Sequence, residues 1–183
     1  MNPEFQPGKL LLATPVMVDP NFAGTVVLLC EVNEKGIMGL ILNRSLDVPL
    51  HEVAPDWKDH SPTSLPLSWG GPVGPDKLHG LHDGQGQDET TLSLVPGLSF
   101  GGLWESFALW HQAGHQIRFF LGYSGWDAGQ LEEECEAGAW YIHPGSPETA
   151  LQEGGEHLWH RLVGQVDPEH AWMRNLPDDP ENN

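Results

Sequence analysis

The chain has 183 residues, enough for one domain with a sizeable core, and its formal net charge of −18 makes it strongly acidic. This charge excludes the basic footprint that direct binding to nucleic acid requires, and no run of 18 apolar residues is present to span a membrane. The N-terminus lacks the basic region of a secretory signal, and Cys30 and Cys135 form no CxxC pair. We therefore expect a cytoplasmic protein that binds neither DNA nor membranes directly.

The first part of the chain predicts antiparallel strands. Leu10–Val16 and Thr25–Val32 are apolar runs, and the second is almost wholly apolar, as in a central strand covered on both faces. Asp19–Gly24 between them carries turn residues. Asn33–Gly36 predicts a hairpin connection, which makes Ile37–Asn43 the antiparallel partner of the preceding strand.

The next part is interrupted by proline and glycine. Val48–Ala54 predicts a short helix, whereas the polar, proline-rich segment Asp56–Pro66 predicts a surface loop. Pro66–Gly84 alternates short strand pieces with turns, and Gly84–Glu89 predicts an exposed loop tip. Thr90–Gly97 predicts a half-buried strand.

Helices and strands alternate in the second half. Gly102–Gly114 has the apolar spacing of a helix that ends at glycine, and Glu156–Val166 is amphipathic. His115–Gly122 and Ala139–Pro144 predict strands, and Ser146 predicts the N-cap of a further helix.

The hairpin requires antiparallel pairing, yet helices and strands are interspersed and no linker divides two cores. The sequence therefore predicts one α+β domain with a mixed β-sheet. We place this domain over residues 1–166. From Asp167 the pattern decays, and residues 167–183 predict an acidic, disordered tail.

The stretch Gln116–Trp140 raises the main question of chemistry, because it predicts a strand, a glycine-rich turn at Gly122–Trp126 and a helix. Ser124 on such a corner resembles the nucleophile of an α/β-hydrolase. The hydrolase pattern is Gly-x-Ser-x-Gly, however, and Trp126 stands two residues after the serine. No downstream histidine has a recognisable context for the base. The sequence thus favours a structural turn and predicts no catalytic residue.

The helix after this turn begins with a capping pattern. Asp127 can serve as N-cap, and Gln130 lies three residues later, as in a capping box. Glu132, Glu133 and Glu134 follow, and three consecutive glutamates indicate a solvated helix face. A cation site would need ligands from a second element.

Ten histidines suggest a metal site, but their spacing does not support one. His157 and His160 share a predicted helix, yet the chain has no HExxH motif and no set of cysteine ligands. The Gly70-Gly71 and Gly101-Gly102 pairs do not match phosphate-binding loops. No metal or cofactor is predicted.

Three parts of the chain resemble the AlgH/YqgE family of small bacterial proteins: LLLATPVMVDPNF with TVVLLCEVNEKGIMGLILNR, WGGPV at Trp69–Val73, and FFLGYSGWDAGQLEEECEAGAWYIHP. The matches span Leu10 to Pro144, and the last is the most specific. The resemblance implies a compact α+β domain with a curved mixed sheet and flanking helices. The family is named for a proposed transcriptional regulator and brings no DNA-binding motif or reaction. It also accepts alanine in the place of Ser124, which argues against a nucleophile there.

The residues that carry the resemblance are also the candidate surface for a ligand or partner: Asn43, Arg44, Gly70, Gly71, Tyr123, Gly125, Trp126 and Gln130. The glycines and the capping box favour fold specification. Asn43 and Arg44 end a strand, and they predict either a recognition surface or hydrogen bonds to a neighbouring loop.

Two functions remain open at this point. The first is a non-enzymatic cytosolic protein that acts through a protein partner, in the regulation of gene expression. The alternative is a small-ligand-binding protein or hydrolase with a pocket near the turns at Asn43 and Tyr123. The sequence leaves the oligomeric state open.

Overall fold

The structure is a computed structural model that describes residues 4–55, 57, 65–84, 89–152 and 154–175. Its strands are β1 (Lys9–Ala13), β2 (Val26–Asn33), β3 (Gly36–Ile41), β4 (Ser45–Leu46), β5 (Leu67–Trp69), β6 (Val73–His82), β7 (Leu92–Val95), β8 (Leu98–Phe100), β9 (Ile117–Asp127) and β10 (Trp140–Pro144). Its helices are α1 (Leu50–Val53), α3 (Trp104–Gln112), α4 (Gln130–Glu136), α5 (Pro147–Leu151), α6 (Glu156–Val166) and the 3-10 helix η1 (Pro168–Asn175).

The strands form one ten-stranded sheet in the order β10-β1-β2-β3-β9-β6-β8-β7, with β4 and β5 attached beside this path. Within the described residues, β5 and β9 pair in parallel, and every other strand pair is antiparallel. The predicted α+β class with a mixed, antiparallel-rich sheet is confirmed. The predicted hairpin is also present, because Asn33 pairs with Gly36 at the end of the β2–β3 ladder.

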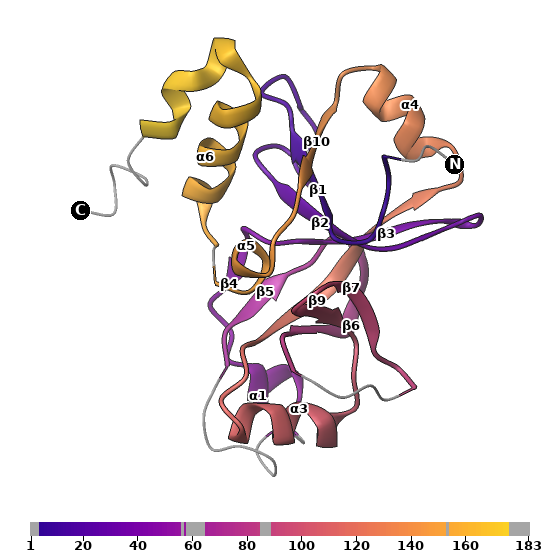
Figure 1. Cartoon of the computed structure of the whole chain (residues 1–183), viewed down its shortest axis with the longest axis vertical. Coiled ribbons are helices and arrows are strands. Elements are labelled where there is room, and N and C mark those ends of the chain that lie inside the picture. Colours follow the sequence, from indigo (N-terminus) through magenta and orange to yellow (C-terminus); the bar gives the residue numbers. More distant parts are fainter. Residues whose placement is uncertain (1–3, 56, 58–64, 85–88, 153, 176–183) are drawn as a thin grey trace.

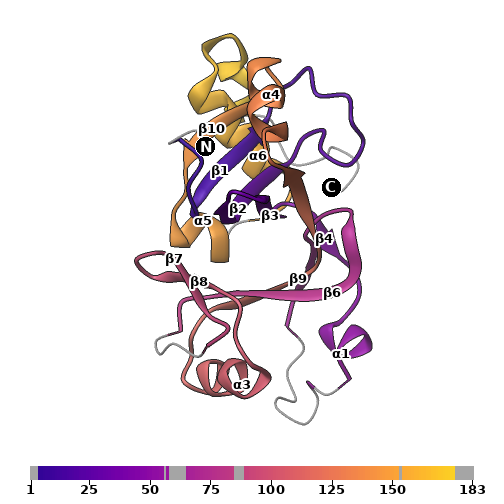
Figure 2. The same ribbon diagram turned by 90° about the vertical axis from the view of Figure 1, so that its right-hand side faces the viewer.

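Strand β9 joins the two ends of the molecule. Its last residues pair with β3, whereas its first residues pair with β6 and β5. In Figures 1 and 2, β1, β2, β10, α4 and α6 lie at one end, and β6, β8, α1 and α3 lie at the other. The predicted glycine-rich turn at Gly122–Trp126 is therefore wrong, because these residues continue β9 through the middle of the sheet.

Glycine is needed here for a close approach between two backbones. A Cβ on Gly70 would lie 2.3 Å from the carbonyl oxygen of Gly122, and a Cβ on Gly71 would lie 2.3 Å from the carbonyl carbon of Tyr123. The backbone N–H of Gly70 donates to the Leu121 carbonyl oxygen at 2.8 Å. Glycines that predict a turn therefore let the segment after β5 lie directly against β9.

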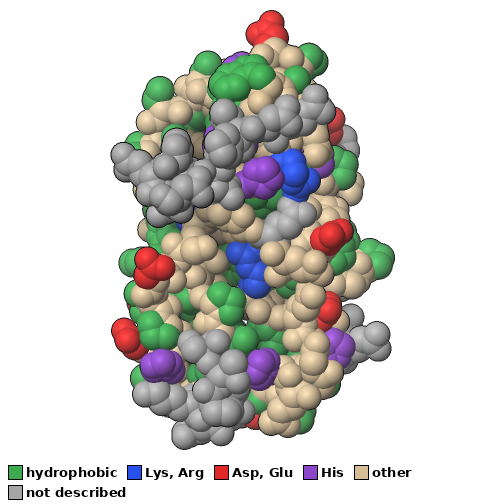
Figure 3. Space-filling model, turned by 90° about the vertical axis from the view of Figure 1, so that its left-hand side faces the viewer, with side chains coloured by type: hydrophobic (Ala, Val, Ile, Leu, Met, Phe, Trp, Pro, Cys, Tyr) green, Lys and Arg blue, Asp and Glu red, His purple; other side chains and the backbone are tan. Residues whose placement is uncertain are grey.

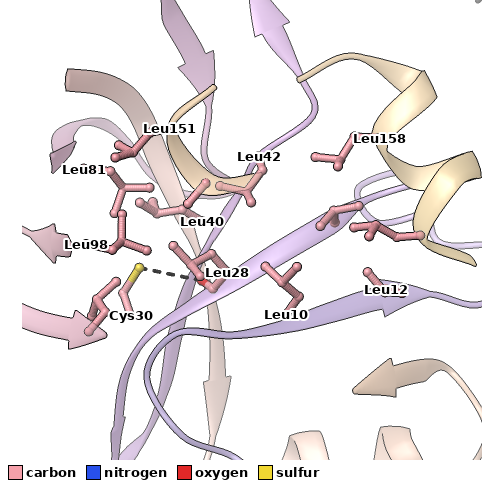
Figure 4. Close-up of a cluster of buried hydrophobic side chains, with 14 of the residues drawn as sticks. Leu10, Leu12, Leu28, Cys30, Leu40, Leu42, Leu81, Leu98, Leu151 and Leu158 are labelled. Atoms are coloured by element: carbon pink, nitrogen blue, oxygen red, sulfur yellow. Dashed lines mark hydrogen bonds between the residues drawn. The ribbon is translucent and has the colours of Figure 1, made fainter. Parts of the chain in front are cut away.

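Both faces of the first strands are buried, since alternate residues point to opposite sides of a strand. On one face, Leu10, Leu28 and Leu40 pack with leucines of α5 and α6, as Figure 4 shows. On the other face, Leu11 and Val27 belong to a cluster that includes residues of β9 and α4. Strand β2 is thus the doubly covered central strand that its apolar sequence predicts.

A third cluster fills the opposite end of the molecule, where residues of α1 and α3 pack against β5 and β9. Trp57 is 1% exposed in this cluster, and its ring centroid lies 5.7 Å from those of Trp104 and Phe119. The predicted surface loop Asp56–Pro66 is wrong at this residue. Most of that segment, like most of the predicted loop tip Gly84–Glu89, lies outside the described residues.

The helix predicted over Glu156–Val166 is confirmed with the same bounds. The chain then forms η1, whose Met173 is buried in the core. The Tyr141 hydroxyl donates to Asp167 Oδ2 at 2.7 Å and connects β10 to the junction between α6 and η1. The folded region therefore extends past the predicted boundary at Val166, and the rest of the predicted tail, residues 176–183, lies outside the described residues.

Candidate ligand-binding site at the end of strand β3

Ser124 has a structural role in β9. The residue is fully buried, it pairs with Gly39 of β3, and its Oγ donates to the Gly70 carbonyl oxygen at 3.2 Å. A nucleophile needs an open side for substrate and a base within hydrogen-bond reach. Burial denies the Ser124 hydroxyl that open side.

The start of α4 differs from the predicted capping box. The N-cap residue is Gly129, and no side chain caps the helix. One half of the predicted pattern is present, because the backbone N–H of Asp127 donates to Gln130 Oε1 at 3.1 Å. Gln130 therefore fixes the connection between β9 and α4.

Glu134 holds two tryptophans in place. Its Oε2 accepts hydrogen bonds from Nε1 of Trp126 at 3.0 Å and from Nε1 of Trp140 at 2.8 Å, while Oε1 accepts from Gln130 Nε2 at 2.9 Å. The two indoles belong to β9 and β10, and their centroids lie 6.0 Å apart. The predicted solvated face is therefore wrong for Glu134, and Trp126 and Gln130 belong to a structural network.

Asn43 closes the turn that precedes β2. The side chain is 6% exposed, its Nδ2 donates to the Gly24 carbonyl oxygen at 2.8 Å, and its Oδ1 accepts from the Val26 N–H at 2.8 Å. Both ends of the amide are thus used within the fold. The strand end that carries Arg44 is held rigidly against this turn.

Arg44 makes the hydrogen bonds to a neighbouring loop that are one of its two predicted roles. Its Nη2 donates to the carbonyl oxygens of Pro20 at 3.0 Å and Ala23 at 3.2 Å, and the guanidinium lies 5.1 Å from the centroid of the Trp69 ring. Its Nε and Nη1 have no hydrogen-bond partner in the described part of the chain. Burial lowers the pKa of Arg44, and the charge of Asp19 acts in the opposite direction.

Arg44 lines a pocket of about 260 Å³. Three separate parts of the chain line it: the turn before β2, the end of β3, and helix α6. The lining residues are Ala23, Gly24, Asn43, Arg44, Trp159 and His160. None of them is acidic, although the chain as a whole is.

Helix α6 contributes Trp159 and His160 to the lining of this pocket. Trp159 Nε1 donates to the Ala13 carbonyl oxygen at 2.7 Å, which fixes the helix against β1. His160 Nδ1 is buried without a hydrogen-bond partner among the described residues. Such an atom is costly in a folded protein. It has no solvent-accessible surface, so other atoms of His160 line the pocket. In the sequence, His160 stands out only through its spacing from His157.

Figure 3 views the side of the molecule on which α6 lies. Basic and histidine side chains lie next to each other near the middle of this face, and acidic side chains lie toward its edges. A local positive region on an acidic protein attracts anions selectively.

Tyr123 lies outside this pocket. It lines a separate, shallow depression with Met38, Val73 and Gly125, among others, and its ring meets that of His79 edge-on at 5.6 Å. The structure therefore brings Asn43 and Arg44 together but does not add Tyr123 to them. Gly70 and Gly71 serve the packing of two backbones, as described above.

Arg118 is a further cation, half-buried within the fold, and no local sequence pattern marks it. Its Nη1 donates to the Ala150 carbonyl oxygen at 2.8 Å, and its Nη2 donates to the Leu42 carbonyl oxygen at 2.8 Å and to Ser68 Oγ at 3.2 Å. Burial lowers the pKa of Arg118 to about 10. These contacts tie β9 to α5, β5 and the end of β3, and so they fix the strand end on which Arg44 follows.

The described ranges contain neither a metal-binding cluster nor a membrane-spanning helix. They contain no cluster of three or more His, Cys, Asp or Glu side chains arranged to hold a metal ion. They also contain no helix with both the length and the apolar character needed to cross a bilayer.

The fold and the site together define a single-domain α+β protein with a large, mostly antiparallel sheet and a small cation-lined pocket at a strand end. The chain belongs to the AlgH-like family, whose family model matches residues 10–171. The predicted resemblance is thereby confirmed.

Relatives in several bacteria match almost the whole length of the chain. It is similar to UPF0301 protein CT0663 of Chlorobaculum tepidum, with 38% identity over 190 residues that cover 100% of both chains. A UPF0301 protein of Streptomyces avermitilis is 35% identical over 182 residues, which cover 96% of this chain and 94% of the relative. The names of these relatives specify no reaction, ligand or partner.

Two solved structures share the fold. The solution structure of the AlgH protein from Pseudomonas aeruginosa matches with a TM-score of 0.75 and 29% identity, and the match covers 98% of each chain. The crystal structure of protein DIP2367 from Corynebacterium diphtheriae matches with a TM-score of 0.77 and 26% identity, covering 94% of this chain and 93% of the other.

Proposed function

We propose that this protein is a non-enzymatic cytosolic protein that acts in the regulation of gene expression by binding a protein partner at the Arg44 pocket. The observation that carries the proposal is the Arg44 guanidinium, which is positioned by two backbone carbonyls and a tryptophan ring while Nε and Nη1 stay open. Arginine is enriched among the residues that dominate binding energy at protein interfaces.

The acidity of the chain supports a protein partner over DNA. Phosphate backbones repel a surface with a formal charge of −18, so an effect on transcription would pass through another protein. The burial of Ser124 supports a non-enzymatic role, since the one nucleophile-like motif of the sequence serves the fold.

Quantitative affinity capture from a bacterial lysate tests this function. We expect a partner that saturates with increasing bait, is lost with Arg44→Ala, and is retained by Lys35→Ala, which removes the same charge from an exposed hairpin residue. Circular dichroism must show that both variants are folded. Partner binding that is indifferent to Arg44→Ala, or no saturable partner under any condition, would refute the proposal.

One observation favours a second function, a small-ligand-binding protein that uses the same pocket. Residues of three separate segments line the pocket, and Asn43 and Arg44 are already held in place by hydrogen bonds within the fold. A ligand at 100 times its dissociation constant adds about 2.7 kcal/mol to the free energy of unfolding. We expect a thermal-shift screen over metabolites to find a compound that stabilises the wild type but not Arg44→Ala. The absence of a shift across a broad panel would reject this function.

A further inference from the structure

We infer that a second pocket, between helix α3 and strands β6 and β9, binds an uncharged small molecule with a single aromatic ring. The pocket has a volume of about 320 Å³ and, within the described residues, shares no lining with the Arg44 pocket. It lies at the end of the molecule that carries α3 (Figure 2). The inference therefore goes beyond the proposed function.

The side chains that a ligand can reach are apolar or aromatic. Four side chains of the lining are exposed or half-buried: Leu78, His79, Leu103 and Trp104. Leu103 is 49% exposed and therefore lies at the mouth of the pocket. Phe107 and Phe119 also line the pocket but are buried, so they support its wall from within. Three glycines add only backbone to the lining.

The charge of the lining disfavours ionic ligands. Of the described residues that line the pocket, none is Asp, Glu, Lys or Arg. Burial, and secondly the charge of Lys77, lower the pKa of His79, so this ring is neutral at pH 7. A charged group that leaves water for such a lining loses its hydration and gains no opposite charge. An uncharged ligand avoids this cost.

Two of the accessible side chains are rings that the fold holds in place. The centroid of the Trp104 ring lies 5.6 Å from that of Phe119 and 5.7 Å from that of Trp57. The His79 ring stacks on Phe100 with a centroid distance of 5.7 Å. Aromatic pairs are more favourable than their buried area alone predicts. The pocket therefore favours an aromatic ligand over an aliphatic ligand of the same size.

The volume of the pocket limits the ligand to about one ring. An apolar cavity of about 150 Å³ accepts benzene, so about 320 Å³ holds one ring with a short substituent. This volume also lies at the lower end of the range of small-molecule pockets, which begins near 300 Å³.

Titration of the full-length protein with benzyl alcohol, followed by NMR at the indole N–H of Trp104, tests the inference. We expect saturation with a Kd of about 1–10 mM, the affinity of a ligand with so few atoms. Benzylammonium has the same ring, and the net charge of −18 attracts it to the protein. It should still bind at least about tenfold more weakly, because its charge must leave water. Arg44→Ala should leave the binding of benzyl alcohol unchanged.

Leu103→Asp tests the mouth of the pocket. Leu103 is the N-cap residue of α3 and has extended backbone there, and aspartate is among the favoured N-cap residues, so the variant should fold. Its carboxylate should weaken the binding of benzyl alcohol at least about tenfold. Leu109→Asp is the matched control, because Leu109 lies on the same helix, is 65% exposed and is outside the pocket lining; it should leave binding unchanged. Each variant must retain the backbone spectrum of the wild type.

The ring contacts are tested with benzyl alcohol and cyclohexylmethanol, which are similar in size and differ in aromaticity. Trp104→Leu keeps an apolar side chain and removes the ring. Relative to the wild type, it should shift the ratio of the two Kd values toward cyclohexylmethanol by about two- to tenfold, the range expected of one aromatic pair. Trp104→Phe keeps a ring and should leave the ratio near that of the wild type. Should Trp104→Leu unfold, Leu103→Asp and the comparison with benzylammonium still decide the inference.

Several outcomes would overturn the inference. The absence of saturation up to about 50 mM, or equal weakening in Leu109→Asp, would exclude binding at this pocket. Tighter binding of benzylammonium would refute the uncharged ligand, and an unchanged ratio in Trp104→Leu would refute the aromatic ligand. Tighter binding of the amide of N-acetyl-phenylalanine than of benzyl alcohol would assign the pocket to an aromatic side chain of another protein and would contradict the small molecule.

Discussion

Substitution Glu134→Ala tests whether the carboxylate between the two tryptophans stabilises the fold. It removes the acceptor for Nε1 of Trp126 and Trp140 and for the side chain of Gln130. Both indoles are 4% exposed, whereas Glu134 itself is half-buried. The substitution therefore mainly removes the hydrogen-bond acceptor of two indole N–H groups, which belong to different strands.

The size of the effect follows from these contacts. A buried donor left without a partner costs about 1–3 kcal/mol, and the lower half of this range applies because water can enter the space that the half-buried Glu134 leaves. Alanine regains a few tenths of a kcal/mol in helix propensity. We expect Glu134→Ala to lower the free energy of unfolding by about 2–3 kcal/mol, which corresponds to a fall in Tm of roughly 4–12 °C for a chain of this length.

Urea denaturation followed by circular dichroism measures the change. Glu133→Ala is the matched control, because it removes the same charge from an exposed position on the same helix, and it should stay within about 0.5 kcal/mol of the wild type. Glu134→Gln keeps one acceptor and should cost about 1 kcal/mol. If Glu134→Ala and Glu133→Ala unfold at the same urea concentration, the role assigned to Glu134 is wrong.

Three further predictions follow from the fold. Gly71→Ala should lower the free energy of unfolding by more than about 3 kcal/mol, because φ is +148° and the new Cβ would lie 2.3 Å from the backbone of β9. Gly24→Ala is the control and should cost about 1 kcal/mol, since its Cβ would meet nothing within 4 Å. Comparable losses of the two variants in thermal unfolding would contradict the close approach of the two backbones. Burial, and secondly the charges of nearby glutamates, raise the pKa of Cys135 to about 11. Alkylation of this thiol at pH 8 should therefore be about 100-fold slower than that of an ordinary thiol and should accelerate as the pH rises toward 11. Alkylation at the ordinary rate would refute this prediction. The hydrogen bond to Asp167 raises the pKa of Tyr141 to about 12, above the ordinary tyrosine value of about 10. The stability that this hydrogen bond contributes is therefore complete below pH 10 and is lost as the pH rises toward 12. Phenolate absorbance should show an ionisation near pH 12 that Tyr141→Phe removes.

Several elements could be predicted because their signals are local. The hairpin at Asn33–Gly36 follows from turn residues between two apolar runs, and the helix Glu156–Val166 follows from its own amphipathic period. Ser146 likewise caps α5 as its position before proline predicts, since its Oγ accepts from the Thr149 N–H at 3.1 Å. In each case the decisive contacts lie within a few residues of one another.

The remaining features depend on segments that are distant in the sequence. The glycines of Gly122–Trp126 predict a turn, and the reason for them is the approach of Gly70 and Gly71. The sequence predicts Glu134 to be one of three solvated glutamates, yet its carboxylate accepts hydrogen bonds from the indoles of two strands. His160 lines a pocket together with a turn and a strand end from the first quarter of the chain. No local pattern predicts these contacts.

Strand β9 also has a consequence for the order of folding. It lies between β3 and β6 in the sheet, so neither end of the molecule has its complete set of partners without it. During synthesis β1, β2 and β3 emerge first, and the edge of β3 stays uncovered until residues 117–127 have left the ribosome. The nascent chain thus exposes an apolar edge while residues 42–127 are synthesised. Once β9 is in place, both ends share one cooperative unit and should exchange their deepest amide hydrogens at one common rate.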